Sequence, residues 1–213
     1  MSPSPSPAYR IETPRLILEA GSPARAEAMK RCIDESLDHL REWLSWAVDE
    51  PTSLEQKIEK LRGFRAAFDR GEHFPYHVIA KDNPDEVVGG AGLVARVGAR
   101  ALEIGYWIAR AHLGKGYAQE ASAALTRVAV DVHDCLRVEI HCDPTNAKSA
   151  NVARKLGYTH DATLRKRLLE PDGTLRDTMV WSILAEEISG SPVARVGYRA
   201  FDAAGRPIPR RVA

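Results

Sequence analysis

HLGKGYAQEA, residues 112–121, is the stretch that decides the fold, because an alternating apolar pattern ends here and a helical pattern begins. Gly114 and Gly116 leave the backbone unobstructed by side chains. The helix that follows directs its first N–H groups outward, and such groups bind anions such as phosphate. The stretch predicts an anion-binding turn at the start of a helix; the alternative is a turn that only begins the helix.

Two nucleotide-binding motifs are excluded by the letters themselves. A P-loop needs GxxxxGK followed by Ser or Thr, and the sequence contains no such string. A dinucleotide fingerprint needs GxGxxG, but the third glycine, counted from Gly114 and Gly116, is replaced by Gln119. A phosphate bound at this turn would therefore belong to another class of ligand, and a turn that only begins the helix remains the alternative.

Length and composition predict one globular domain, with 44% hydrophobic and 28% charged residues among 213. The 30 basic and 29 acidic side chains leave a formal charge of +1, so no overall field recruits nucleic acid or an anionic membrane. Three cysteines without a CxxC pair are typical of a reduced, cytoplasmic protein. The Ser-Pro alternation of residues 1–8 predicts a disordered lead-in and not a signal peptide.

The periodicity of the chain predicts a mixed α/β sheet. A first strand is expected over residues 9–20, with an edge or a bend at Pro14. The expected order continues with helices over 22–44 and 52–71, strands over 75–81, 86–97 and 101–109, a helix over 116–133, a strand over 137–143, a short helix closed by Gly157, and two strands around the turn at 171–173. Gly105 in mid-strand predicts a bulge. The tail after residue 187 is expected to pair with a sheet edge, a partner subunit or nothing.

Four motifs in this order resemble the GNAT superfamily of acetyl-CoA-dependent N-acetyltransferases, and in particular its RimJ/RimL-like branch. They are IGYWI (104–108), GKGYAQEA (114–121), DPTNAKSANVARKLGY (143–158) and RDTMVWSIL (176–184). The resemblance implies a GNAT fold, in which a mixed, mostly antiparallel sheet of about seven strands has flanking helices. It divides the chain into a lead-in at 1–8, an acetyltransferase domain at 9–187 and a C-terminal extension at 188–213.

The resemblance also implies where acetyl-CoA is held. The family's pyrophosphate signature falls on Leu113, Gly114, Lys115, Gly116, Tyr117 and Ala118. Leu113 departs from the Gln or Arg that the family prefers, which matters little where backbone amides make the contact. The pantetheine arm is expected to pair with the strand around Trp107 and Ile108. Asn146 matches the asparagine that hydrogen-bonds this arm, with helix capping as the alternative.

Acetyl transfer from a thioester to an amine needs a deprotonated amine, a stabilised oxyanion and a proton for the departing thiolate. By resemblance, Glu103 is the general base, acting through water, with a solvent-facing charge as the alternative. A backbone N–H near Trp107 is expected to hold the oxyanion. The position where many members of the family carry a tyrosine acid is Ala153 here. The resemblance to RimL-like relatives instead implies Ser149 as the proton donor or as a residue that orients a water. The alternative for Ser149 is an ordinary helix hydroxyl.

Trp43 and Trp46 are expected either to form an apolar wall over the acceptor or to pin their loop to the core. Tyr76 and Trp181 are further candidates for acceptor contacts. The seven histidines form no metal-ligand set, so no metal is expected.

The sequence therefore predicts an N-acetyltransferase that moves an acetyl group from acetyl-CoA to a primary amine by direct transfer in a ternary complex. The amine belongs to a protein N-terminus, an aminoacyl compound or another small molecule, and the modest net charge disfavours a polycationic acceptor. The alternative is a non-catalytic acyl-CoA sensor or interaction module, which the alanine at position 153 favours. Neither nucleic acid nor a membrane is an expected partner, and the protein is expected to be a monomer or homodimer.

Overall fold

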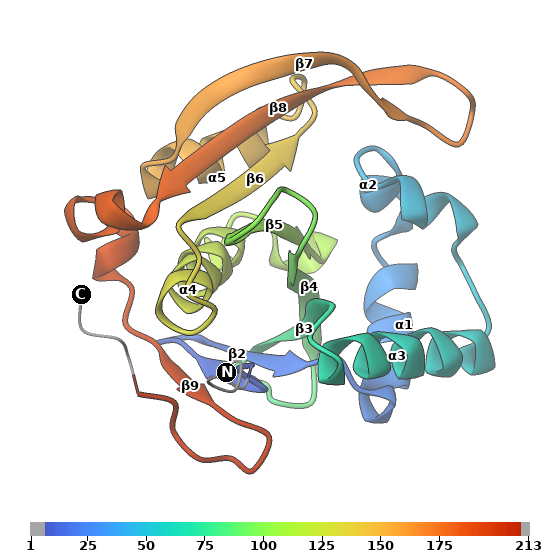
Figure 1. Cartoon of the computed structure of the whole chain (residues 1–213). Coiled ribbons are helices and arrows are strands. Elements are labelled where there is room, and N and C mark those ends of the chain that lie inside the picture. Colours follow the sequence, from blue (N-terminus) through green and yellow to red (C-terminus); the bar gives the residue numbers. More distant parts are fainter. Residues whose placement is uncertain (1–6, 210–213) are drawn as a thin grey trace.

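The structure is a computed structural model that describes residues 7–209, and this part of the chain forms one nine-stranded sheet with helices on both faces (Figure 1). The strand order is β7-β8-β6-β5-β4-β3-β2-β1-β9. Neighbouring strands are antiparallel except β5 and β6, which are parallel. The strands are β1 (Arg10–Glu12), β2 (Leu16–Ala20), β3 (His73–Ala80), β4 (Val87–Val94), β5 (Ala101–Ile108), β6 (Arg137–Cys142), β7 (Thr159–Leu169), β8 (Leu175–Leu184) and β9 (Arg199–Phe201). The mixed, mostly antiparallel sheet is confirmed, with nine strands where about seven were expected.

The N-terminal segment is a hairpin and not one strand over 9–20. β1 and β2 pair antiparallel with Ile11 opposite Leu18, and the chain reverses around Pro14, which confirms the predicted bend. The Thr13 hydroxyl oxygen accepts a hydrogen bond from the Leu16 N–H at 2.9 Å and stabilises this reversal. The hairpin supplies one of the two additional strands.

The single helix expected over 22–44 is wrong. Two α-helices occupy this region, α1 (Ala26–Asp34) and α2 (Leu37–Arg41), after a short 3-10 helix at Pro23–Arg25. Ser36 lies between them, buried, and its hydroxyl accepts a hydrogen bond from the Arg110 N–H at 3.1 Å. This contact joins residues that are distant in sequence, so helical periodicity carries no sign of the interruption.

Helices cover the two faces of the sheet in separate layers (Figure 1). α1 and α3 (Leu54–Asp69) lie on one face, called here the α3 face, where Met29, Ile33 and Leu61 are buried. α4 (Tyr117–Asp131) and α5 (Ala147–Leu156) lie on the other, the α4 face. Four of the five alanines of α4 are fully buried against the sheet, at 121, 123, 124 and 129, because small side chains let a helix approach closely.

β5 and β6 separate halfway along their length. Their pairing runs from Ala101 opposite Arg137 to Ile104 opposite Ile140, whereas β5 remains paired with β4 as far as Ile108. The register between β4 and β5 is continuous through Gly105, so the predicted bulge there is wrong. Gly105 is instead the first residue of β5 beyond the paired segment. The opening between β5 and β6 that begins there is called the gap.

The C-terminal tail packs onto the rest of the fold. β9 pairs antiparallel with β1, with Ala200 opposite Ile11, so pairing with a sheet edge is confirmed among the three alternatives. Val193 and Tyr198 are buried in the same core as α4. At the other end, residues 1–6 of the expected lead-in lie outside the described residues, and Ala8 is fully buried. The expected disorder therefore does not extend to Ala8.

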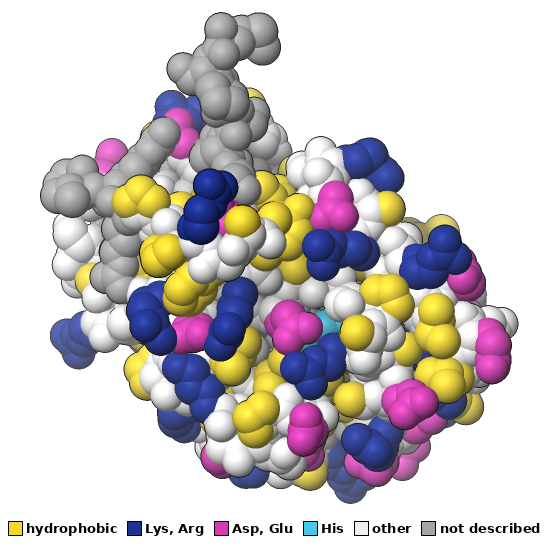
Figure 2. All heavy atoms as spheres, turned by 90° about the horizontal axis from the view of Figure 1, so that it is seen from below, with side chains coloured by type: hydrophobic (Ala, Val, Ile, Leu, Met, Phe, Trp, Pro, Cys, Tyr) yellow, Lys and Arg dark blue, Asp and Glu magenta, His cyan; other side chains and the backbone are white. Residues whose placement is uncertain are grey.

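The surface carries a mixture of charges. Figure 2 shows the molecule from below, and basic and acidic side chains are interspersed over this face with apolar ones between them. This mixture agrees with the formal charge of +1. Within residues 7–209, no helix has the length and the apolar character needed to cross a membrane.

Candidate functional site

The glycine turn lies at the N-terminal end of α4. Gly114 and Gly116 have φ angles of +78° and +80°, a left-handed conformation that glycine adopts without strain. α4 begins at Tyr117, so the amides of its first turn have no acceptor within the helix. Leu113 and Lys115 are exposed beside them. Exposed amides at a helix N-terminus form an anion-binding geometry.

Arg15 holds this turn in place from the β1–β2 reversal. Its Nη1 donates to the Lys115 carbonyl at 2.8 Å, and its Nε donates to the Glu120 carboxylate on α4 at 2.6 Å. The Thr13 hydroxyl donates to the other oxygen of Glu120 at 2.6 Å. The guanidinium of Arg15 also lies 5.1 Å from the centroid of the Tyr117 ring. Arg15 thus brings a positive charge to the turn, a contribution that its position in the sequence does not reveal.

The direction of the backbone along β5 decides which residues face the gap. The Ala109 N–H donates to the Val88 carbonyl of β4 at 2.9 Å, and hydrogen-bonding directions alternate along a strand. Tyr106 and Ile108 therefore direct their backbone groups toward the gap, and Trp107 directs its own toward β4. The Ile108 carbonyl accepts a hydrogen bond from His39 Nε2 of α2 at 3.1 Å. An extended ligand arm can pair with this side of β5 like an added strand.

Glu103 lies at the closed end of the gap, only 4% exposed, so its solvent-facing alternative is wrong. Its carboxylate accepts hydrogen bonds from Arg96 Nε at 2.6 Å and from Arg96 Nη2 at 2.5 Å. This contact raises the pKa of Arg96, because it stabilises the charged guanidinium. His141 of β6 lies between two carboxylates, with Nδ1 3.3 Å from Glu103 Oε2 and Nε2 2.6 Å from Glu139 Oε2.

Sequence reasoning missed His141 and Glu139. The available signal was the alternation of β6, which places both side chains on one face of the strand. What the pattern could not supply was the register, in which Glu139 lies directly opposite Glu103. That pairing brings the three titratable groups together.

Ser149 of α5 contacts Tyr106 of β5, and their hydroxyl oxygens are 2.8 Å apart. Burial raises the pKa of Tyr106, so this hydroxyl stays protonated and can donate. Asn146 caps α5, because its Oδ1 accepts a hydrogen bond from the Ser149 N–H at 3.0 Å. The amide nitrogen of the same side chain has its own donor capacity for a ligand. Ala153, by contrast, is fully buried in the core.

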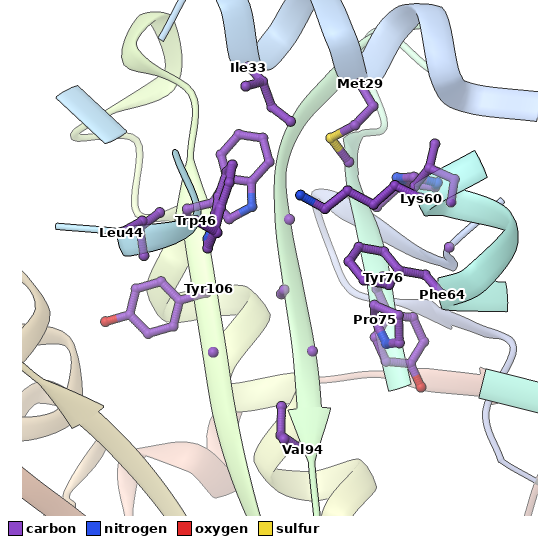
Figure 3. Close-up of a pocket in the computed structure, with 18 of the residues that line it drawn as sticks. Met29, Ile33, Leu44, Trp46, Lys60, Phe64, Pro75, Tyr76, Val94 and Tyr106 are labelled. Carbon is purple, nitrogen blue, oxygen red and sulfur yellow. The ribbon is translucent and has the colours of Figure 1, made fainter. Parts of the chain in front are cut away.

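A cavity of about 430 Å³ opens on the α3 face beside the gap (Figure 3). Its walls come from α1, α3 and the loop between α2 and α3, and its floor comes from β3, β4 and β5. The apolar wall residues include Met29, Ile33, Leu44, Trp46, Leu61 and Phe64. The floor includes Gly90, Gly92, Gly105 and Trp107. The indole of Trp46 lies 5.9 Å from that of Trp107, centroid to centroid.

The four aromatic candidates for acceptor contacts divide into two pairs. Trp46 and Tyr76 line the cavity, although the Tyr76 hydroxyl is engaged by the Ala8 carbonyl at 2.8 Å. Trp43 and Trp181 are not among the described residues that line it. Trp181 is buried on β8, with its ring 4.9 Å from that of His160.

Residues 15–159, more than half of the chain, match the family described as "Acetyltransferase (GNAT) domain". Among curated relatives, the uncharacterized protein YkkB of Bacillus subtilis is 32% identical over 129 residues, which are 59% of this chain and 64% of YkkB. The uncharacterized N-acetyltransferase p20 of Bacillus licheniformis is 31% identical over 122 residues, which are 56% of this chain and 67% of p20. The chain thus spans about two thirds of the length of these relatives.

Solved structures show the same fold. RimJ of Mycobacterium smegmatis, in complex with CoA-disulfide, superposes with a TM-score of 0.75 and 27% identity, over 90% of this chain and 93% of RimJ. RimL, a ribosomal L7/L12 alpha-N-protein acetyltransferase in complex with coenzyme A, gives a TM-score of 0.72 and 22% identity, over 81% of this chain and 95% of RimL. With the gap, the glycine turn and the four motifs in register, these matches show that the chain belongs to the GNAT acetyltransferase family, in its RimJ/RimL-like branch.

Proposed function

We propose that this protein transfers the acetyl group of acetyl-CoA directly to a primary amine bound in the same complex. The observation that carries the proposal is that one short segment of β5, residues 105–107, borders both the gap and the cavity. The backbone of Tyr106 faces the gap, while Gly105 and Trp107 form part of the cavity floor. A thioester in the gap and an amine in the cavity would meet at this segment, which is the proximity that direct transfer requires.

The residues of the gap fit coenzyme A along its length. The amides of residues 113–118 and the N-terminus of α4 suit the pyrophosphate, with Arg15 and Lys115 adding positive charge. Tyr106 and Ile108 offer backbone partners to the pantetheine arm, and Asn146 offers its amide nitrogen. The relatives support this donor, since the structure of MccE, a microcin C7 self-immunity acetyltransferase, holds acetyl-CoA and AMP.

The proposed chemistry forms a bond from the amine nitrogen to the acetyl carbon and breaks the carbon–sulfur bond. Glu103 takes the proton of the amine through a water, and His141, between two carboxylates, shares that proton. Arg96 is 62% exposed along its side chain and lines the cavity, so it can move away from Glu103 when the acceptor enters. A backbone N–H facing the gap stabilises the oxyanion. The Tyr106–Ser149 hydroxyl pair stabilises the departing thiolate by hydrogen bonding, and the thiolate takes its proton from solvent.

Release of free thiol from acetyl-CoA, measured with a panel of N-terminal peptides, aminoacyl nucleotides, small amines and polyamines, tests the proposal. Glu103→Gln is expected to lower kcat by about 100-fold or more, the loss typical of a missing general base, with the Kd for CoA unchanged by calorimetry. Glu12→Gln is the matched control, because Glu12 is also a buried strand glutamate held by arginines. Its kcat should equal that of the wild type.

Two results would contradict the proposal in different ways. A normal kcat in Glu103→Gln removes Glu103 from the base role and leaves transfer itself intact. Tight CoA binding without thiol release for any amine favours the acyl-CoA sensor over the enzyme.

A further inference from the structure

We propose that the acceptor is an amine on a flat apolar body that carries an anionic group at its far end, and that Lys60 binds this anionic group. The inference rests on the proposed function, because it names the substrate class of the same site. Three features of the cavity carry it: a floor made of glycine backbone and one indole, a path lined by two indoles, and lining charges that are all positive.

The floor of the cavity is flat because glycines form it. Gly92 of β4 lies opposite Gly105 of β5, and Gly90 lies opposite Trp107. A Cβ placed on Gly90 would approach the Trp107 Nε1 to 2.6 Å, so the indole rests directly on the backbone of β4. A Cβ placed on Gly105 would have no atom within 4 Å, so the space above this residue is open. Backbone and an indole together make a surface that suits a planar ring.

Two indoles lead from the gap to Lys60. Trp107 belongs to the β5 segment at the gap, and Trp46 lies 5.9 Å from it. The ammonium of Lys60 lies 5.5 Å from the centroid of Trp46, and Figure 3 shows the side chain of Lys60 in the cavity. An amine that reacts at the gap and an anion that reaches Lys60 are therefore separated by a body of about one ring.

The charged residues that line the cavity are all basic: Lys57, Lys60 and Arg96 are present, and no aspartate or glutamate is among the described lining residues. Lys57 is 2% exposed and paired with Glu50, and Arg96 is paired with Glu103. Lys60 lies 3.9 Å from Glu50 Oε1, the same oxygen that Lys57 contacts. Lys60 is therefore the lining cation with the weakest carboxylate contact and the one best able to bind a ligand.

The charge of Lys60 discriminates between ligands. It attracts an anionic group and repels a second ammonium, and water screens both interactions in part because the Lys60 side chain is 40% exposed. Polyamines and other polycations are thus the least suited acceptors. Carboxylate and phosphate share the required chemistry.

A series of para-substituted phenethylamines tests the proposal with acetyl-CoA in the thiol-release assay. The substituents are carboxylate, phosphate, neutral carboxamide and aminomethyl, so that size changes little between carboxylate and carboxamide. We expect kcat/KM for the carboxylate or the phosphate to exceed that for the carboxamide by about tenfold or more, the effect of a charge-assisted hydrogen bond. The diamine should be the poorest acceptor. The ratio of carboxylate to phosphate identifies which anion is preferred.

Variants at Lys60 test whether this residue causes the preference for an anionic acceptor. Lys60→Gln should bring the carboxylate-to-carboxamide ratio close to one, and Lys60→Glu should make the diamine the better substrate. Lys155→Gln is the matched control, since Lys155 is exposed on α5, on the other face of the sheet. The carboxylate-to-carboxamide ratio of this variant should equal that of the wild type.

Gly105→Val fills the open space on the floor and should lower kcat/KM for the whole aromatic series. A wild-type enzyme that prefers the carboxamide or the diamine overturns the proposal.

Binding of the acetylated products, measured by calorimetry, separates this inference from the proposed function. A tighter Kd for the acetamido carboxylate than for the acetamido carboxamide, lost in Lys60→Gln, supports the ligand class even if thiol release is absent. Turnover without any charge preference, together with equal Kd values for the two products, contradicts the proposed class of acceptor. The proposed acetyltransferase activity would not be affected by this result.

Discussion

Tyr106 is the residue at which the two halves of the site meet. It lines the cavity, its backbone faces the gap, and its hydroxyl lies 2.8 Å from that of Ser149. If this pair stabilises the departing thiolate by hydrogen bonding, Tyr106→Phe should lower kcat by about tenfold to 100-fold and leave the Kd for CoA unchanged. Tyr158→Phe is the control, because the buried Tyr158 also contacts a hydroxyl, that of Thr126, at 2.7 Å. Equal losses of kcat in both variants would indicate a packing effect and not stabilisation of the thiolate.

His133 predicts a pH dependence of stability that is separate from catalysis. Burial lowers its pKa to about 4, and its ring lies 4.3 Å from that of Phe74. Below the unfolded value of about 6.5, the unfolded chain binds a proton that the folded chain excludes, so stability falls as the pH drops toward 4. The loss from this group is at most about 3 kcal/mol.

Denaturant unfolding at pH 7 and pH 4.5 measures this effect. His133→Gln should lose less free energy of unfolding between the two pH values than the wild type does. His73→Gln, at an exposed position, should behave like the wild type. An unchanged pH dependence in His133→Gln would contradict the assignment.

At the scale of elements, a variant in the turn before α4 can distinguish the cost of backbone strain from the loss of ligand binding. Gly114 and Gly205 have φ angles of +78° and +74°, and a Cβ at either would meet no atom within 4 Å. Alanine at each position should therefore cost a similar free energy of unfolding, about 1–2 kcal/mol. Only Gly114→Ala should also raise the Kd for CoA, because only Gly114 belongs to the proposed pyrophosphate contact. An equal rise in Kd for Gly205→Ala would show that global destabilisation, and not the turn, controls binding.

The same elements show which parts of the fold and the site could be predicted from the sequence. The turn at 114–116 and the helix after it are visible in the letters, because glycine freedom and helical spacing are local properties. Gly105 was predicted as a bulge and proved to mark the separation of β5 from β6, since the departure of a neighbouring strand leaves no local signal. The contacts of Arg15 with Glu120 and of His141 with Glu103 depend on tertiary register. The positions of individual elements were thus more predictable than the partners of the site residues.

At the scale of the whole molecule, the C-terminal tail runs from β8, next to one edge of the sheet, to β9 at the opposite edge. β9 covers the edge of β1, and the Tyr198 hydroxyl donates to Asp131 at the end of α4 at 2.7 Å. α4 carries the glycine turn at its other end, so the tail and the proposed cofactor site share one helix. Loss of tail contacts is therefore expected to destabilise the acetyltransferase fold itself, although the family match ends at residue 159.

Val193 provides the sharpest test of this coupling, because its side chain is fully buried in the core that contains α4. Val193→Ala removes two methyl groups and should lower the free energy of unfolding by about 2 kcal/mol. Arg195→Ala, two residues further along and exposed, should change it by less than about 0.5 kcal/mol. Chemical denaturation monitored by tryptophan fluorescence measures both. A single cooperative transition, shifted in Val193→Ala and unshifted in Arg195→Ala, is expected if the tail unfolds together with the domain. An early separate transition, with the main one unshifted, would show that the tail is an independent attachment.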